Sequence, residues 1–153
     1  MRVIKAPEPI RIVGRSVFLA GSIDMGKAVD WQKEITDALS AYDVTILNPR
    51  RDDFDPDLEQ SITEPRFVEQ VEWELNALDR ADVIAMYFDP AGKAPITLAE
   101  LGLHAKSGKL VVCCPEGYWR RGNVQVMCKK YRIPLTDSIQ TLINAVKARV
   151  AIP

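Results

Sequence analysis

Glu100 is the residue in this sequence whose surroundings most suggest chemistry. It stands among apolar residues in the stretch PITLAELGLHAKSGK, residues 95–109. Thr97 and Glu100 fit the [ST]xxE pattern of a capping box, in which the glutamate binds the backbone at a helix start. The local sequence favours that cap. A carboxylate at the start of a helix that faces a ligand crevice could instead be a nucleophile aimed at an electrophilic carbon, so both roles stay open here.

Glu74 is a second carboxylate in a promising position. It lies one helical turn after Val71, in a helix predicted over residues 64–81. The apolar stripe of that helix is expected to point inward and consists of Phe67, Val71, Leu75 and Leu78. Two acidic groups near one site suit a nucleophile and a proton donor, although a half-exposed helix glutamate is the commoner case. The only histidine, His104, has no cysteine or histidine cluster with metal spacing around it, so we expect neither a metal site nor a cofactor.

Apolar strands alternate with amphipathic helices along the chain. Strands are expected at 16–21, 44–48, 82–88 and 109–115, with a short fifth at 133–137; helices are expected at 30–42, with Asp30 as N-cap, and at 64–81, 97–107, 122–131 and 138–150. This alternation predicts one α/β domain over residues 15–153. We expect a doubly wound parallel sheet of Rossmann or flavodoxin type, with about five strands and helices on both faces. Residues 1–14, which include two prolines, are expected to form an extended arm.

Candidate binding residues follow these strands directly. In doubly wound sheets, ligands bind at the carboxyl ends of the strands. Gly21 ends the first strand and lets the backbone approach a ligand closely, and Asp24 could accept hydrogen bonds from a sugar or a base edge. Asn48 begins the second such loop, and Asp89 begins the third. The first loop lacks both the GxGxxG and the P-loop patterns, so it could also be a plain strand-to-helix turn.

Composition and charge exclude several classes of protein. The chain has 153 residues, 47% of them hydrophobic, and a net charge of −1, so it is an ordinary globular chain with no field that attracts nucleic acid or membrane. No apolar run approaches the length of a membrane span. The three cysteines, two of them adjacent, do not suit a disulfide framework and favour reduced thiols in a cytoplasmic protein.

Five segments taken in order resemble the nucleoside 2-deoxyribosyltransferase-like family. They are VFLAGSID (17–24), NPRR (48–51), WELNALDRADVIAMYFDP (73–90), ITLAELGLHAKSGK (96–109) and GNVQV (122–126). The resemblance implies a doubly wound α/β fold and cleavage of the N-glycosidic bond of (deoxy)nucleosides or nucleotides. It also implies that Glu100 attacks the sugar C1′ to form a glycosyl-enzyme ester, from which a second base or water releases the sugar with net retention.

Further residues of this chain match functional positions of the family. Gly21, Ser22 and Asp24 match the first ligand loop, and Thr97 matches the small hydroxyl residue before the catalytic glutamate. Glu74 aligns with the acidic residue that contacts the nucleobase, where transferases usually have aspartate. The family's aspartate shortly before the catalytic glutamate has no counterpart in the segment GKAPITLAE.

The resemblance also implies a homo-oligomer. Asn123 matches the asparagine that reaches a neighbouring subunit's sugar 5′-hydroxyl.

Three functions remain in view. The first is transfer on 2-deoxynucleosides. The second is hydrolysis of nucleoside 5′-monophosphates, for which Ser22, the first-loop glycines and Lys93 or Arg50 could hold the phosphate. The third, of another class, is a nucleotide-binding module without catalysis, because a fold alone never proves chemistry.

Overall fold

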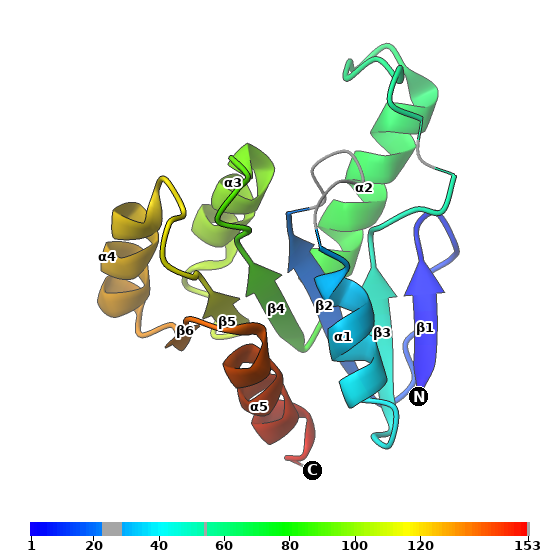
Figure 1. Cartoon of the computed structure of the whole chain (residues 1–153). Helices are drawn as coiled ribbons and strands as arrows, with labels where there is room; N and C mark the ends of the chain where they lie inside the picture. Colours follow the sequence, from blue (N-terminus) through cyan, green and yellow to red (C-terminus); the bar gives the residue numbers. More distant parts are fainter. Residues whose placement is uncertain (23–28, 54, 153) are drawn as a thin grey trace.

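The computed structural model describes residues 1–22, 29–53 and 55–152. In these parts of the chain, six parallel strands form one sheet in the order β1-β3-β2-β4-β5-β6 (Figure 1). The strands are β1 (Arg2–Lys5), β2 (Arg15–Gly21), β3 (Val44–Asn48), β4 (Val83–Tyr87), β5 (Leu110–Cys113) and β6 (Leu135–Thr136). After β2, the next strand in the chain, β3, lies on one side of β2, and the one after it, β4, lies on the other side of β2. The carboxyl ends of β2 and β4 therefore flank the switch point where doubly wound folds bind ligands.

Five helices in the described residues cover the two faces of this sheet: α1 (Trp31–Ala38), α2 (Pro65–Arg80), α3 (Pro95–His104), α4 (Arg121–Tyr131) and α5 (Ile139–Val150). Helices α2, α3 and α4 pack on one face, and α1 and α5 pack on the other. Successive strand residues point to opposite faces. In β2, Phe18 accordingly joins the core under α2–α4 and Leu19 joins the core under α1 and α5. The predicted doubly wound α/β fold is confirmed.

The predicted helices and strands match the observed ones closely, except that the sheet has an additional strand. Asp30 is the N-cap of α1 as predicted, and its side chain accepts a hydrogen bond from the Lys33 backbone N–H. The sheet has one strand more than expected because residues 2–5, in the segment expected as an arm, pair with β3. The division into an arm of 1–14 and a domain of 15–153 stays a prediction.

Helix α2 departs from its predicted apolar stripe at Leu75. Leu75, expected to point inward, is 43% exposed, whereas Trp73, Ala77 and Leu78 are buried. The N-terminal segment fixes this rotation of the helix. The Trp73 indole donates a 2.8 Å hydrogen bond to the Glu8 carbonyl, and the Arg80 guanidinium donates one of 2.9 Å to the Ile10 carbonyl.

Candidate functional site

Ser22 joins the carboxyl ends of the two central strands. Its backbone N–H donates to the Tyr87 carbonyl at 3.2 Å, and its hydroxyl accepts from the Asp89 backbone N–H at 3.1 Å. Its own carbonyl accepts from the Trp31 indole at 3.1 Å. Ser22 is buried, and an accepting hydroxyl still carries one hydrogen to donate. The end of β2 is therefore held rigidly against the end of β4.

Gly21 is required by packing at this same point. A Cβ placed on it would lie 2.3 Å from the Tyr87 carbonyl oxygen and 2.8 Å from the Trp31 ring. Both distances are shorter than van der Waals contact. The predicted role of Gly21 in approaching a ligand stays a prediction, and the structure adds that this glycine lets β2, β4 and α1 meet.

Asn48 is the last residue of β3 and belongs to a polar cluster at the carboxyl end of that strand. Its side-chain oxygen accepts from the Arg50 backbone N–H at 3.0 Å. The Arg50 guanidinium donates to the Gln32 side-chain oxygen at 3.3 Å and lies 3.7 Å from Asp30. Gln32 is fully buried, and its amide nitrogen has no hydrogen-bond partner in the part of the chain that the structure describes. The sequence analysis missed Gln32 because a glutamine in the first turn of an amphipathic helix looks like a surface residue.

Asp89 shapes the loop after β4. Its carboxylate accepts a hydrogen bond of 2.9 Å from the Ala91 backbone N–H, as in an Asx turn, while its own N–H binds Ser22. The observed role of Asp89 is therefore local and structural. Asp24, the remaining predicted residue of the first loop, lies outside the described residues.

The predicted capping box at Thr97 is wrong. Helix α3 begins two residues earlier, at Pro95, and its N-cap is Ala94, in the left-handed conformation with φ 47° and without a side-chain cap. Proline is favoured at the first helical position, where its missing N–H costs nothing. Thr97 is therefore a buried residue inside the first turn, and Glu100 lies in the second turn. The Glu100 carboxyl does not serve as the predicted cap.

Glu74 and Glu100 form an interacting pair of half-buried carboxyl groups. Burial, followed by the negative charge of Glu74, raises the pKa of Glu100 from 4.5 to about 8. Burial also raises the pKa of Glu74 from 4.5 to about 7, while a hydrogen bond with Gln70 acts to lower it. Two neighbouring carboxyls whose pKa values are both raised titrate as a coupled pair. Near neutral pH, such a pair offers one acid and one carboxylate.

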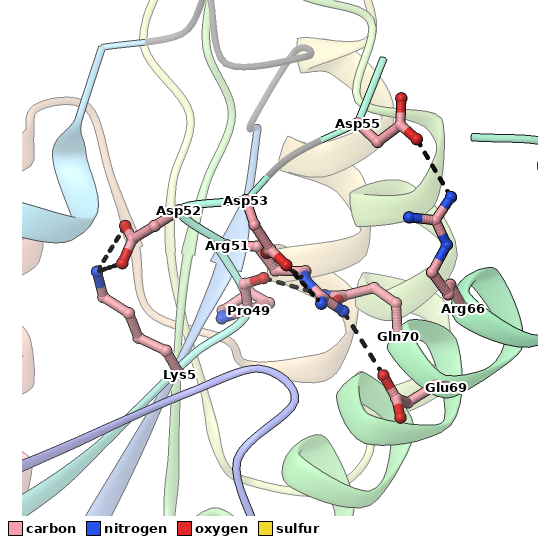
Figure 2. Close-up of polar contacts among 9 residues, drawn as sticks. All are labelled: Lys5, Pro49, Arg51, Asp52, Asp53, Asp55, Arg66, Glu69 and Gln70. Carbon is pink, nitrogen blue, oxygen red and sulfur yellow. Dashed lines mark hydrogen bonds and ion pairs between the residues drawn. The ribbon is translucent and has the colours of Figure 1, made fainter. Parts of the chain in front are cut away.

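Gln70 on α2 binds the loop after β3 at Arg51 and Pro49, and the sequence analysis missed these contacts. Figure 2 shows the Gln70 side chain between Arg51 and the Pro49 carbonyl, and the preceding residue, Glu69, also lies near Arg51. The spacing of Gln70 and Glu74, one helical turn apart on α2, was the available signal.

Asn123 is on neither of the helices that carry the pair. It is exposed on α4, which lies on the opposite side of α3 from α2 (Figure 1).

No group of histidine, cysteine, aspartate and glutamate side chains within the described ranges could hold a metal ion. His104 is buried near the end of α3, and its Nε2 lies 4.0 Å from the Asp79 carboxylate. Burial, followed by the charge of Lys109, lowers its pKa. None of the described helices is long and apolar enough to cross a membrane.

Fold and site together define a doubly wound α/β protein with an interacting pair of carboxyls on helices α2 and α3. Residues 14–118 match the model of a family described as nucleoside 2-deoxyribosyltransferase like, and the chain belongs to that family. This confirms the resemblance found in the sequence.

A solved structure supports the fold independently. It is described as a conserved protein from Enterococcus faecalis V583, superposes with a TM-score of 0.62 at 10% sequence identity, and matches over 90% of this chain and 99% of its own. No curated protein matches the chain significantly.

Proposed function

We propose that the protein transfers the sugar of 2-deoxynucleosides between bases, with Glu100 as the nucleophile. The observation that carries this proposal is the pairing of Glu100 with Glu74, two half-buried carboxyls whose pKa values burial raises. Membership of the nucleoside 2-deoxyribosyltransferase-like family supports the same chemistry.

The reaction follows the logic of a retaining glycosidase. A Glu100 carboxylate oxygen attacks C1′, the bond from C1′ to the base nitrogen breaks, and the leaving base takes a proton from Glu74. An acceptor base then attacks C1′ of the glycosyl ester, releases Glu100 and returns a proton to Glu74. Two displacements at one carbon give net retention. The productive form of the pair therefore carries its shared proton on Glu74 and its negative charge on Glu100.

The substrate is proposed to lie along the carboxyl ends of β2, β3 and β4. The residues offered for binding are Gly21, Ser22, Asp24, Asn48, Glu74, Asp89 and Thr97. The Ser22 hydroxyl hydrogen supports this placement, because the hydroxyl is held by the Asp89 N–H and can still donate.

Hydrolysis of nucleoside 5′-monophosphates is the second candidate. It is favoured by Arg50, whose side chain is only 22% exposed and lies at the carboxyl edge of the sheet, beside buried Asn48 and Gln32. Lys93 offers less support, because its ammonium group already lies 4.4 Å from the centre of the Trp119 ring. A binding module without catalysis would have no need of two half-buried carboxyls with raised pKa values.

We also propose a cytoplasmic homo-oligomer in which Asn123 reaches a neighbouring subunit's site. Apolar side chains exposed on α3 and α4 support a partner at these helices: Ile96, Leu103 and Val126 are 66%, 62% and 69% exposed. The three cysteines are all free and buried, which suits a reducing compartment.

A product assay tests the proposed function. The protein is incubated with each deoxynucleoside, with and without a free acceptor base, and with each deoxynucleoside 5′-monophosphate, and the products are separated. Base exchange supports transfer, and release of base from the monophosphate alone supports hydrolysis. We expect Glu100→Gln to lose activity by several orders of magnitude, and Glu72→Gln, an exposed glutamate of α2, to retain it. No turnover of any nucleoside or nucleotide would overturn the proposal.

A further inference from the structure

Charge is distributed unevenly along the chain, although the net charge is only −1. Residues 52–82 hold eleven acidic side chains against two basic ones, whereas residues 101–132 hold seven basic ones against one acidic. The fold keeps these two stretches apart. The first includes α2 and the second includes α4, and both helices pack on the same face of the sheet with α3 between them (Figure 1).

The outward side of α3 is uncharged. Its exposed residues are Pro95, Ile96, Ala99, Gly102 and Leu103. A helix on the surface of a globular protein ordinarily shows charged or polar residues to solvent. Residues 96, 99 and 103 share one face of the helix because they are spaced by three and four positions. A Cβ built on Gly102 meets no described atom within 4 Å, so this side of α3 is open to a partner.

The two helices beside α3 carry charges of opposite sign next to an exposed aliphatic side chain. On α2, Leu75 is 43% exposed, and the exposed Asp79 follows it by one helical turn. On α4, Val126 is 69% exposed, and the exposed Lys129 and Lys130 follow it by one turn. Helix α2 has four acidic and two basic residues, whereas α4 has three basic residues and no acidic one. The outer faces of α2 and α4 are therefore complementary in charge.

These charges are little used within one copy of the chain. Lys129 and Lys130 form no ion pair with a carboxylate of the described residues. The Asp79 side chain is 74% exposed, and its one such contact is with His104 Nε2 at 4.0 Å. Both signs of charge are thus available to a second molecule.

We propose that a second copy of this chain docks on this face as a two-fold dimer, with α3 against α3 and the acidic α2 of each copy against the basic α4 of the other. This inference deepens the homo-oligomer of the proposed function and rests on it. The uncharged stripe of α3 forms the centre of the interface, and charged residues surround it. An apolar centre with a polar rim is the usual anatomy of a protein–protein interface.

The charges select one of two symmetric arrangements. Two layers that stack face to face are related by a two-fold axis in the plane between them. An axis across the helices would place α2 on α2 and α4 on α4, so that like charges meet. An axis along α3 places each α2 on the partner's α4, so that opposite charges meet at two equivalent places. The second arrangement also turns Asn123, in the first turn of α4, toward the partner's α2, the helix that carries Glu74.

Sedimentation velocity of the full chain over a range of protein and salt concentrations tests the dimer. Leu103→Glu places a charge in the apolar centre and should raise the dissociation constant at least about 100-fold. Asp79→Lys and Lys130→Glu each bring like charges together, so each should raise it about tenfold at low salt. The two combined should return it to within about threefold of the wild type. Lys147→Glu, on α5 at the opposite face of the sheet, is the matched control and should leave it unchanged.

Disulfide trapping distinguishes the two axes. With the axis along α3, each residue of α3 lies near its own copy, so Ile96→Cys and Leu103→Cys should each form a disulfide-linked dimer under mild oxidation. With the axis across the helices, residue 96 of one copy would lie near residue 103 of the other. Cross-linking only in a mixture of the two variants would therefore contradict the proposal. The three native cysteines are buried, so the introduced thiols are the accessible ones.

Thermal melts establish that each variant is folded, as expected for exposed positions. A wild type that stays monomeric at every concentration would overturn the inference, and so would a dimer that is indifferent to Leu103→Glu or a double variant that associates no better than the single ones. None of these readouts needs turnover. A dimer of this arrangement without turnover would remove the proposed function and leave the inference standing, whereas base exchange by a monomer would do the reverse.

Discussion

Replacing Glu100 by glutamine should stabilise the protein at alkaline pH while abolishing its proposed activity. The carboxyl of Glu100 is buried against Glu74, and its pKa is raised from 4.5 to about 8. Glutamine has nearly the same shape and never ionises. The variant therefore removes the cost of forming a charge in this site and leaves the packing of α3 unchanged.

The sign follows from proton binding. Between pH 4.5 and about 8, the folded state keeps a proton on Glu100 that the unfolded chain has released. The free energy of unfolding therefore falls as pH rises through this window, and the penalty is complete above the folded pKa. Each pKa unit corresponds to about 1.4 kcal/mol, so a rise of about 3.5 units sets an upper limit near 5 kcal/mol. Because the group is only half-buried, we expect roughly 2–3 kcal/mol at pH 8.5 and under about 1 kcal/mol at pH 5.

Urea unfolding of wild type and Glu100→Gln at pH 5 and pH 8.5 measures this difference. Wild type should lose stability between the two values, and the variant should lose less. The free energy of unfolding of the variant should still fall with rising pH, less steeply and only up to about pH 7, because Glu74 has its own raised pKa of about 7. Glu72→Gln, exposed on α2, is the control and should follow the wild type. Parallel pH profiles for wild type and Glu100→Gln would refute the burial of an ionisable pair.

Three further substitutions test the frame of the site. Gly21→Ala should lower the free energy of unfolding by about 2–4 kcal/mol in thermal or urea melts, because its Cβ would meet the Tyr87 carbonyl at 2.3 Å; a wild-type melting temperature would contradict this geometry. Trp31→Phe should cost about 1–2 kcal/mol, since the Ser22 carbonyl loses its indole donor, and an unchanged urea midpoint would argue against that bond. Asn123→Ala should leave stability within about 0.5 kcal/mol, as for an exposed residue, yet reduce deoxynucleoside turnover; full activity would remove Asn123 from the proposed shared site.

The strands and helices were largely predictable because their signals are local. The β-branched run at residues 44–48 matches β3 at both ends, and the amphipathic pattern from residue 138 matches α5. Strand β1 was missed because it is a short edge strand, paired with β3 alone among the described strands. Its four residues carry no alternation strong enough to distinguish them from an arm.

The start of α3 shows how a local motif can mislead. Thr97 and Glu100 satisfy a capping pattern, but Pro95 begins the helix two residues earlier and places both inside it. Leu75 shows the same limit on α2, where hydrogen bonds from Trp73 and Arg80 to the N-terminal segment accompany a rotation that leaves Leu75 exposed.

By itself, the sequence determined the alternation of strands and helices, and hence that residues after β2, β3 and β4 would meet at one edge of a parallel sheet. It also singled out Glu74 and Glu100. Only the tertiary structure decided that these two carboxyls interact, that burial raises the pKa of each, and that Gln70 connects α2 to the loop at Arg51. The reason is physical: periodicity depends on neighbours in the chain, whereas desolvation and charge repulsion depend on neighbours in space.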